Sequence, residues 1–362
     1  MGGRPSPGCS SVRLMIGICA VGVGFLTGGV GVAAAAPVSC GEIITANTKL
    51  QADLVDCPGD GVVIGSDNIT LDLGGHTIDG LGSAAPFGSD GIDNSGGYDN
   101  VVIKNGTVTE FQQGVALVGT TGNVARNLIV AGNLGDAFFV DGFAALDSNG
   151  NQLVGNRVFS NGGGIDLRGS SDNVIRANSS TGNGGVGIAV TFSSQNNTVN
   201  DNALTGNGGQ GIFLLDGANG NHLVRNVVAA NTLTGVLIAN SSTNAVAANR
   251  IAQNGGDGLG VVSDFPLVSA GNVLARNDLT ANDFDGIFVD PGTTETVVLA
   301  NEASENADDG IDVRNAVTTI TRNIADRNVD LGIDAVLGVL DGGGNRATGN
   351  GNPLQCVNVV CS

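Results

Sequence analysis

The sequence repeats itself at intervals of about 24 residues along most of its length. Asn202–Leu215 and Asn277–Asp290 share one frame: Asn, four residues, a second Asn, three residues, Gly and a short apolar run. The same Asn spacing occurs at positions 156/161, 178/183, 202/207, 226/231, 249/254, 277/282, 301/306, 323/328 and 345/350. Asn127 and Asn133 form a tenth pair that is one residue longer. A fixed period of this length predicts a repeat architecture in which each unit stacks on its neighbours.

Each repeat unit predicts three short strands joined by turns. In the unit Gly164–Val186, the segments "GIDLR" and "NVIRAN" alternate apolar and polar residues, and Gly, Ser and Asn gather between them. Such alternation is typical of strands, and such clusters are typical of turns. Three short strands cannot enclose a core alone, so we predict that each strand pairs with its equivalents in neighbouring units. The result is a parallel β-helix that rises about 4.8 Å per coil.

The recurring Asn and Gly residues have a structural explanation in such a coil. Equivalent positions stack, so each Asn amide can bond to the next coil and accept from the previous one. Asn also tolerates the left-handed backbone of tight turns, and we expect the Gly before each strand to meet a similar demand. We therefore assign these residues no chemistry.

The string "GI-apolar … N-x4-N-x3-G" resembles the repeats of right-handed parallel β-helices in the pectate-lyase-like superfamily. The closest resemblance is to carbohydrate-binding and sugar-hydrolase β-helix modules, which also occur in periplasmic maturation proteins for nitrous oxide reductase. It extends over about residues 60–355, and the leader ending in "GHTIDG" is similar to the start of many exported β-helix proteins. The resemblance implies an all-β, single-stranded right-handed parallel β-helix of about a dozen rungs. It also implies a protein that binds extracellular polysaccharide, or acts on it as a lyase or glycoside hydrolase.

The N-terminal segment predicts export. Arg4 and Arg13 precede the apolar stretch "LMIGICAVGVGFLTGGVGV" and then "AAAAP", which is the order of a secretory signal peptide. We place cleavage after Ala35 or Ala36; a retained membrane anchor is the alternative reading. The expected product is secreted to the extracellular space or cell envelope. The predicted parts are a signal peptide (1–36), an N-terminal cap with the first rungs (37–90), the β-helix repeats (91–355) and a C-terminal cap (356–362).

Four cysteines lie outside the predicted signal peptide. Cys40 and Cys57 precede the repeats, whereas Cys356 and Cys361 follow them. An even number of cysteines in an exported chain favours disulfides, so we predict Cys40–Cys57 in the N-terminal cap and Cys356–Cys361 in a C-terminal disulfide loop. No cysteine or histidine spacing suits a zinc site.

The charge limits the possible partners. The formal net charge is −19, and loss of Arg4 and Arg13 with the signal peptide makes it −21 (−19 − 2). This charge disfavours nucleic acid and anionic membranes. It also disfavours anionic polysaccharide unless a cation bridges the two. We expect a monomer that binds no membrane after signal cleavage.

Acidic residues gather on the outward face of the strands that follow each Gly. With alternation from the Gly, the outward column is Asp93, Ala116, Phe139, Asp166, Ala189, Phe213, Leu237, Gly260, Phe288, Asp312 and Asp334. Asp257, Asp285 and Asp309 stand directly before Gly residues of three successive units. Stacking would bring Asp312 and Asp334 to about 5 Å. Arg314 would point outward beside them.

Three interpretations of this acidic cluster are open. Asp312 and Asp334 could be a catalytic carboxyl pair for glycoside hydrolysis, with Arg314 stabilising charge or taking a proton from an acidic sugar. Asp285, Asp309, Asp312 and Asp334 could instead bind calcium as a cofactor, because hard cations prefer carboxylate oxygens. The cluster could also be a solvated acidic ridge, since Asp60, Asp90 and Asp136 occupy the same position before Gly in distant units.

Other features leave the function open. His76 and His222 fit turn and strand positions, and we expect both to be structural. The chain has no Trp and one Tyr, and Phe139, Phe213 and Phe288 lie on separate rungs, so we expect no sugar-stacking platform. The alternative to a polysaccharide-active protein is a non-catalytic surface scaffold or binding module.

Overall fold

The computed structural model describes residues 37–141, 147–264 and 266–362. The predicted signal peptide lies outside these residues. In the described part of the chain, the only helical element is the short 3-10 helix η1 (Gly82–Ala84), and no helix is long and apolar enough to cross a membrane.

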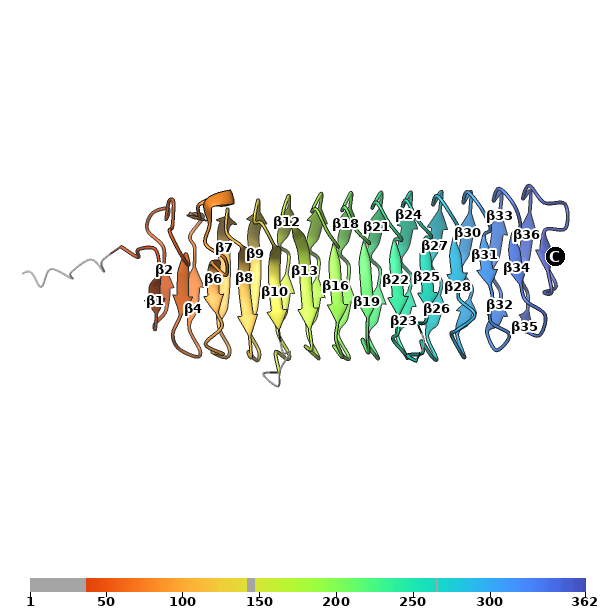
Figure 1. Ribbon diagram of the computed structural model, residues 1–362, viewed down its shortest axis with the longest axis horizontal. Coiled ribbons are helices and arrows are strands. Elements are labelled where there is room, and N and C mark those ends of the chain that lie inside the picture. The colour runs from red at the N-terminus through yellow and green to blue at the C-terminus, as the bar shows by residue number, and fades with distance from the viewer. Residues whose placement is uncertain (1–36, 142–146, 265) are drawn as a thin grey trace, which may run out of the picture. The chain divides into compact units, whose positions relative to one another are not determined.

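The strands that follow the repeated Gly form one parallel sheet, which we call the Gly sheet (Figure 1). Consecutive members come from consecutive coils, and all of the pairings are parallel. Its fourteen strands are β1 (Glu42–Ile44), β3 (Val62–Ile64), β6 (Asp90–Asn94), β8 (Gln113–Val118), β10 (Asp136–Asp141), β13 (Gly163–Arg168), β16 (Ile188–Thr191), β19 (Ile212–Leu215), β22 (Val236–Ala239), β25 (Leu259–Val262), β28 (Ile287–Val289), β31 (Ile311–Val313), β34 (Ile333–Ala335) and β37 (Cys356–Val357).

Two further columns of parallel strands complete each coil. The second column contains β2 (Thr48–Lys49), β4 (Thr70–Asp72), β11 (Gln152–Val154), β14 (Val174–Arg176), β17 (Thr198–Asn200), β20 (His222–Val224), β23 (Ala245–Ala247), β26 (Val273–Ala275), β29 (Val297–Leu299), β32 (Thr319–Thr321) and β35 (Leu340–Gly343). The third contains β5 (Thr77–Asp79), β12 (Arg157–Phe159), β15 (Ser179–Thr181), β18 (Ala203–Thr205), β21 (Val227–Ala229), β24 (Arg250–Ala252), β27 (Asp278–Thr280), β30 (Glu302–Ser304), β33 (Ile324–Asp326) and β36 (Arg346–Thr348). The long strands β7 (Val102–Thr109) and β9 (Val124–Ala131) run through both columns. The predicted all-β parallel β-helix is therefore confirmed.

The core is a continuous stack of aliphatic side chains inside the coil. Ile165, Ile188, Ile212 and Val236 stack in the Gly sheet, and each is at most 1% exposed. The alternation predicted from the sequence sends their neighbours outward. Burial of such a side chain contributes about 1.5–3 kcal/mol, so the stacked units stabilise one another.

The stacked-amide explanation of the repeated Asn is confirmed. The backbone N–H and Nδ2 of Asn226 donate to Oδ1 of Asn249 at 2.8 and 3.0 Å, and those of Asn249 donate to Oδ1 of Asn277 at 3.0 Å each. A further ladder of the same kind, absent from our sequence interpretation, runs through positions 123, 151, 173, 197, 221, 244 and 272. Its signal in the sequence is an Asn five residues before the first member of a pair.

Two details of that interpretation are wrong. The left-handed backbone belongs to the residue before each stacked Asn, as at Arg225 and Ala248 with φ of 55°, because the Asn itself must direct its amide along the coil axis. In the longer pair, Asn127 is likewise left-handed and Leu128 occupies the ladder position, donating its N–H to Asn156.

The Gly before each strand meets a different demand from the one expected. A Cβ on Gly235 would lie 2.5 Å from Ile251 and 2.7 Å from the carbonyl oxygen of Gly258 in the next coil. Its φ is not positive, so close approach between coils, and not backbone handedness, requires Gly here.

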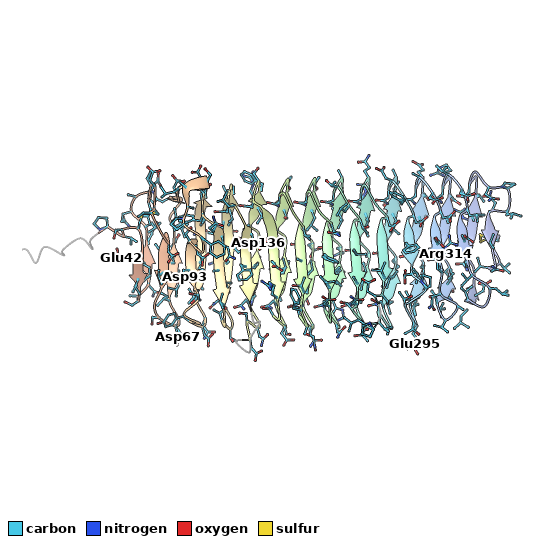
Figure 2. The ribbon with its side chains drawn as sticks, viewed as in Figure 1. Glu42, Asp67, Asp93, Asp136, Glu295 and Arg314 are labelled. Atoms are coloured by element: carbon cyan, nitrogen blue, oxygen red, sulfur yellow. A yellow bond between two sulfur atoms is a disulfide. The ribbon has the colours of Figure 1, made fainter. Side chains whose placement is uncertain are left out.

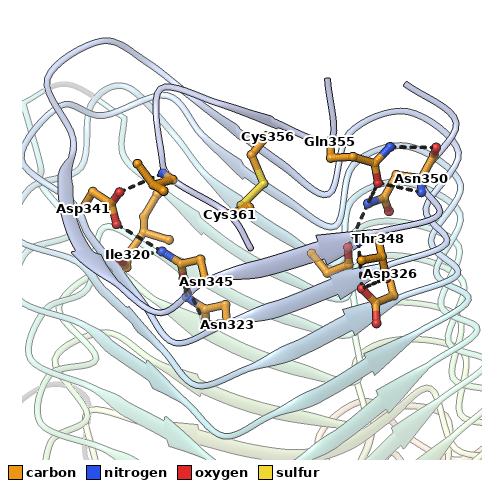
Figure 3. The surroundings of a disulfide bond; sticks show 12 residues. Ile320, Asn323, Asp326, Asp341, Asn345, Thr348, Asn350, Gln355, Cys356 and Cys361 are labelled. Atoms are coloured by element: carbon orange, nitrogen blue, oxygen red, sulfur yellow. Dashed lines mark hydrogen bonds between the residues drawn. A yellow bond between two sulfur atoms is a disulfide. The ribbon is translucent and has the colours of Figure 1, made fainter. Parts of the chain in front are cut away.

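Disulfides close both ends of the described chain. Cys40 is joined to Cys57, and Cys356 to Cys361. At the C-terminal end, Gln355 Oε1 accepts from the backbone N–H and Nδ2 of Asn350 at 3.0 Å each (Figure 3). Gln355 thus supplies the acceptor that an Asn of a further coil would otherwise provide, and so ends one amide ladder beside the disulfide.

Candidate functional site

The stacking of the outward column predicted from the sequence is confirmed residue by residue, although Ala116, Gly260 and Asp312 are buried. Each member pairs in register with the next, from Asp93 with Ala116 to Phe288 with Asp312 and Asp312 with Asp334. Asp93, Asp136 and Arg314 lie along the same row of strands (Figure 2). Because the side-chain period of a strand is two, the Gly phase was enough to predict which residues face outward.

The aspartates before the Gly residues form a ladder of their own. Asp257 Oδ1 accepts the N–H of Asp285 at 3.2 Å, and Asp285 Oδ1 accepts the N–H of Asp309 at 2.9 Å. Asp309 Oδ1 then accepts the N–H of Leu331 at 2.7 Å. The same bond joins Asp60 to the N–H of Asp90 at 2.9 Å. These carboxylates therefore have a structural role in the turns, while their second oxygens extend the acidic cluster.

Arg314 lies between the two aspartates of the outward column. Its Nε is 2.6 Å from Asp312 Oδ1, and its Nη2 is 3.4 Å from Asp334 Oδ2. The Asp312 side chain is 6% exposed, whereas those of Asp334 and Arg314 are 23% and 45% exposed. Arg314 thus neutralises part of the charge of both carboxylates.

Burial raises the pKa of several carboxyl groups in this region. Desolvation, reinforced by the charges of Asp257, Asp312 and Asp309, raises the pKa of Asp285 to about 8. Desolvation raises the pKa values of Asp257 and Asp309 to about 6 each. It also raises the pKa of Asp312, although the bond to Arg314 opposes the shift. Asp285 therefore holds its proton at neutral pH.

The carboxylates fall into two groups rather than the single metal site expected from the sequence. Oxygens of Asp285, Asp308 and Asp309 lie within 4.8 Å of one another, and so do oxygens of Asp309, Asp312 and Asp334. Arg314 shares the second group. Asp308 is exposed and directly precedes Asp309 in a turn. The turn conformation brings its carboxylate into the first group, and strand alternation does not predict that conformation.

Aromatic rings lie beside an arginine on this face, which the sequence did not predict. The Arg168 guanidinium lies 5.8 Å from the ring of Phe139 and 5.1 Å from that of Phe192, a residue outside the outward column. Asp136, whose pKa burial raises to about 6, is close enough to Arg168 for their charges to interact. Phe284 is 56% exposed beside the acidic cluster. The three Phe residues considered from the sequence still lie on separate rungs.

The histidines lie outside the acidic cluster. His76 Nδ1 is 3.0 Å from Oδ1 of Asp53, which lies on the preceding coil. His222 begins β20. The residues that the structure brings together are therefore those of the C-terminal carboxylates.

Family models match two overlapping parts of the chain. The model described as periplasmic copper-binding protein (NosD) matches residues 92–286, and that described as right handed beta helix region matches residues 219–358. The second description agrees with the hand implied by the sequence resemblance. No curated protein matches the chain.

Solved structures with the same fold include epimerases. A double mutant of the periplasmic alginate epimerase AlgG is 16% identical with a TM-score of 0.55, and the match covers 88% of this chain and 78% of that one. The A-module of Azotobacter vinelandii mannuronan C-5 epimerase AlgE4 is 13% identical with a TM-score of 0.55, covering 89% and 91%. The AlgE6 A-module from the same organism is 18% identical with a TM-score of 0.54, covering 90% and 89%. At these identities, the likeness shows the fold.

The donor set of the described residues does not suit copper. Copper sites use imidazole, thiolate or thioether ligands. Both methionines precede residue 37, and all four cysteines in the described ranges are in disulfides. His76 and His222 lie several coils apart. The carboxylate oxygens suit a hard cation instead.

Proposed function

This chain belongs to the family of periplasmic copper-binding proteins (NosD), and from that premise we propose that it is an exported β-helix protein that binds polysaccharide on the outward face of its Gly sheet. The observation that carries this proposal is the gathering of Asp285, Asp309, Asp312 and Asp334 on neighbouring coils. Carboxylates accept hydrogen bonds from sugar hydroxyls, and a row of coils offers successive positions for the units of an extended chain. The alginate epimerases, which share the fold by their structures, provide a precedent for polysaccharide as the ligand.

We place the protein outside the cytoplasm. The family description names periplasmic proteins, and disulfides of the kind that close both ends persist in oxidising compartments. Secretion beyond the cell envelope is the more specific form of this proposal, and cell fractionation distinguishes the two.

Polysaccharide binding is tested with the purified chain lacking residues 1–36. We expect retention on at least one of a panel of immobilised neutral and acidic polysaccharides. The double variant Asp309→Asn, Asp312→Asn should bind at least about tenfold more weakly, because it removes two charged hydrogen-bond acceptors. The control Glu302→Gln changes an exposed carboxylate on β30, in a different column of strands. Absence of binding to the whole panel would favour the non-catalytic scaffold.

Glycoside hydrolysis is a second candidate function, supported by the pairing of Asp312 with Asp334. Asp312 is the more buried of the two and desolvation raises its pKa, so we assign it the role of proton donor to the glycosidic oxygen. The more exposed Asp334 would form the glycosyl bond that water then hydrolyses. Asp312, left as a carboxylate beside Arg314, would then take a proton from the attacking water. Release of reducing ends by the wild type, lost in Asp334→Asn while binding is kept, is the expected result; binding without release of reducing ends contradicts it.

Calcium is the cofactor we propose for the group Asp285, Asp308 and Asp309. Their oxygens lie within 4.8 Å of one another without an arginine between them, and a divalent cation bound there would replace the proton of Asp285 and be held by the three carboxylates. A calcium concentration about fivefold above the dissociation constant should raise the unfolding temperature by roughly 2–4 °C relative to chelator. Asp308→Asn should reduce this rise, whereas Glu302→Gln should keep it. Equal melting curves of the wild type in both conditions would show that the acidic ridge is solvated.

A further inference from the structure

A groove adjoins the acidic cluster where the chain enters the Gly sheet. It has a volume of about 370 Å³ and is lined by residues of four successive coils, among them Leu233, Gly256, Asp257 and Phe284. Leu233 and Phe284 stand at equivalent positions, each two residues before the Gly that begins its coil, with Gly256 at that position in the coil between. The missing side chain at Gly256 separates two apolar side chains that are 47% and 56% exposed.

The spacing across this groove suits a flat, partly apolar ring. Leu233 and Phe284 are two coil steps apart, which corresponds to about 9.6 Å along the coil axis. A ring between them would contact the Phe284 face on one side and the Leu233 methyl groups on the other. Such aromatic contacts contribute specificity as well as area, and ligand sites in this size range combine apolar walls with a few polar groups.

The polar group of this groove is Asp257. Its Oδ1 accepts the N–H of Asp285, which leaves Oδ2 for a ligand hydroxyl. Gln210 also lines the groove and can both donate and accept. Leu233 and Phe284 suit the apolar C–H faces of a pyranose ring. Asp257 and Gln210 suit the hydroxyls at its edges.

The surrounding charge selects among pyranoses. Asp257 interacts electrostatically with Asp312 and Asp308, and Asp285 and Asp309 continue its column. Arg314, the cation of the adjoining cluster, is already ion-paired with Asp312 and Asp334. A uronate carboxylate would therefore meet repulsion here, whereas a neutral hydroxyl would meet acceptors.

We propose that the groove formed by Leu233, Gly256, Asp257 and Phe284 is a subsite for one neutral pyranose unit of a polysaccharide. This inference rests on the proposed polysaccharide binding and specifies its ligand class. It distinguishes the chain from the epimerases of similar fold, whose named substrates, alginate and mannuronan, are polyuronates.

The test compares neutral gluco-, manno- and galacto-hexaoses with hexamannuronate by titration calorimetry, in chelator. We expect at least one neutral hexaose to bind more tightly than the uronate. Phe284→Ala should weaken that binding about 3- to 10-fold, while Phe284→Tyr keeps it. The matched control is Leu337→Ala, which removes another exposed apolar side chain, in the turn after β34. Unfolding midpoints of all variants establish that each is folded.

The outcomes separate the subsite from the wider function. Binding that is weakened by Asp309→Asn with Asp312→Asn but unchanged in Phe284→Ala overturns the subsite and leaves polysaccharide binding in place. Preference for hexamannuronate overturns the neutral ligand class alone. If none of these oligosaccharides and no polysaccharide of the panel binds, both proposals fail.

Discussion

Asp285→Asn should stabilise the protein at pH 8.5 and have little effect at pH 4. The pKa of Asp285 is about 8 in the folded protein, against an ordinary value of 3.8. Below pH 3.8 both folded and unfolded chains hold the proton, so the carboxyl costs nothing. Between the two values only the folded chain holds it, and stability therefore falls as the pH rises, until the full penalty is reached above pH 8. Asn removes this penalty and keeps the side-chain oxygen that accepts the N–H of Asp309.

The expected gain is on the order of 2–4 kcal/mol at pH 8.5, because one pKa unit corresponds to about 1.4 kcal/mol and neighbouring carboxyls share part of the shift. Urea unfolding at both pH values, in chelator, measures it. Glu302→Gln, on an exposed position of β30, should change stability equally little at both. A gain in Asp285→Asn that does not grow with pH would show that Asp285 is ionised at little cost.

Asn249→Ala should destabilise the protein by roughly 1–3 kcal/mol. The Asn249 side chain accepts two bonds from Asn226 and donates to Asn277 and to the carbonyl oxygen of Leu223 at 2.9 Å. The side chain is buried, so its loss leaves donors on the preceding coil without a partner. The urea midpoint should fall, with a slope like that of the wild type.

Two variants serve as comparisons for this amide ladder. Asn249→Asp keeps the acceptor oxygens and loses the donor, so we expect a charged, buried carboxylate whose cost increases with pH. Gln152→Ala removes an exposed amide on β11 and should leave the midpoint unchanged. If Asn249→Ala and Gln152→Ala behave alike, the stacked amides do not support the coil as we describe.

Much of the fold could be predicted from the period and its phase. The spacing of Asn202 and Asn207, repeated in successive units, predicted coils whose amides stack, and the Gly phase predicted that Asp312 would pair with Asp334. Both predictions depend on the repeat period of the Asn residues and on the two-residue alternation of side chains along each strand. The further Asn ladder through positions 123 to 272 is also visible in the spacing, because its members recur with the same period as the Asn pairs.

The turns and their side chains required the tertiary structure. The sequence by itself determined a stacked coil, its inward and outward residues and an acidic C-terminal third, because strand alternation and a fixed period allow few other arrangements. It did not reveal that Asp285 bonds to the N–H of Asp309, that Arg314 lies between Asp312 and Asp334, or that Phe284 and Leu233 flank Gly256. These contacts join side chains from different coils at turns, where backbone dihedrals, and not a repeating alternation, decide where each side chain points.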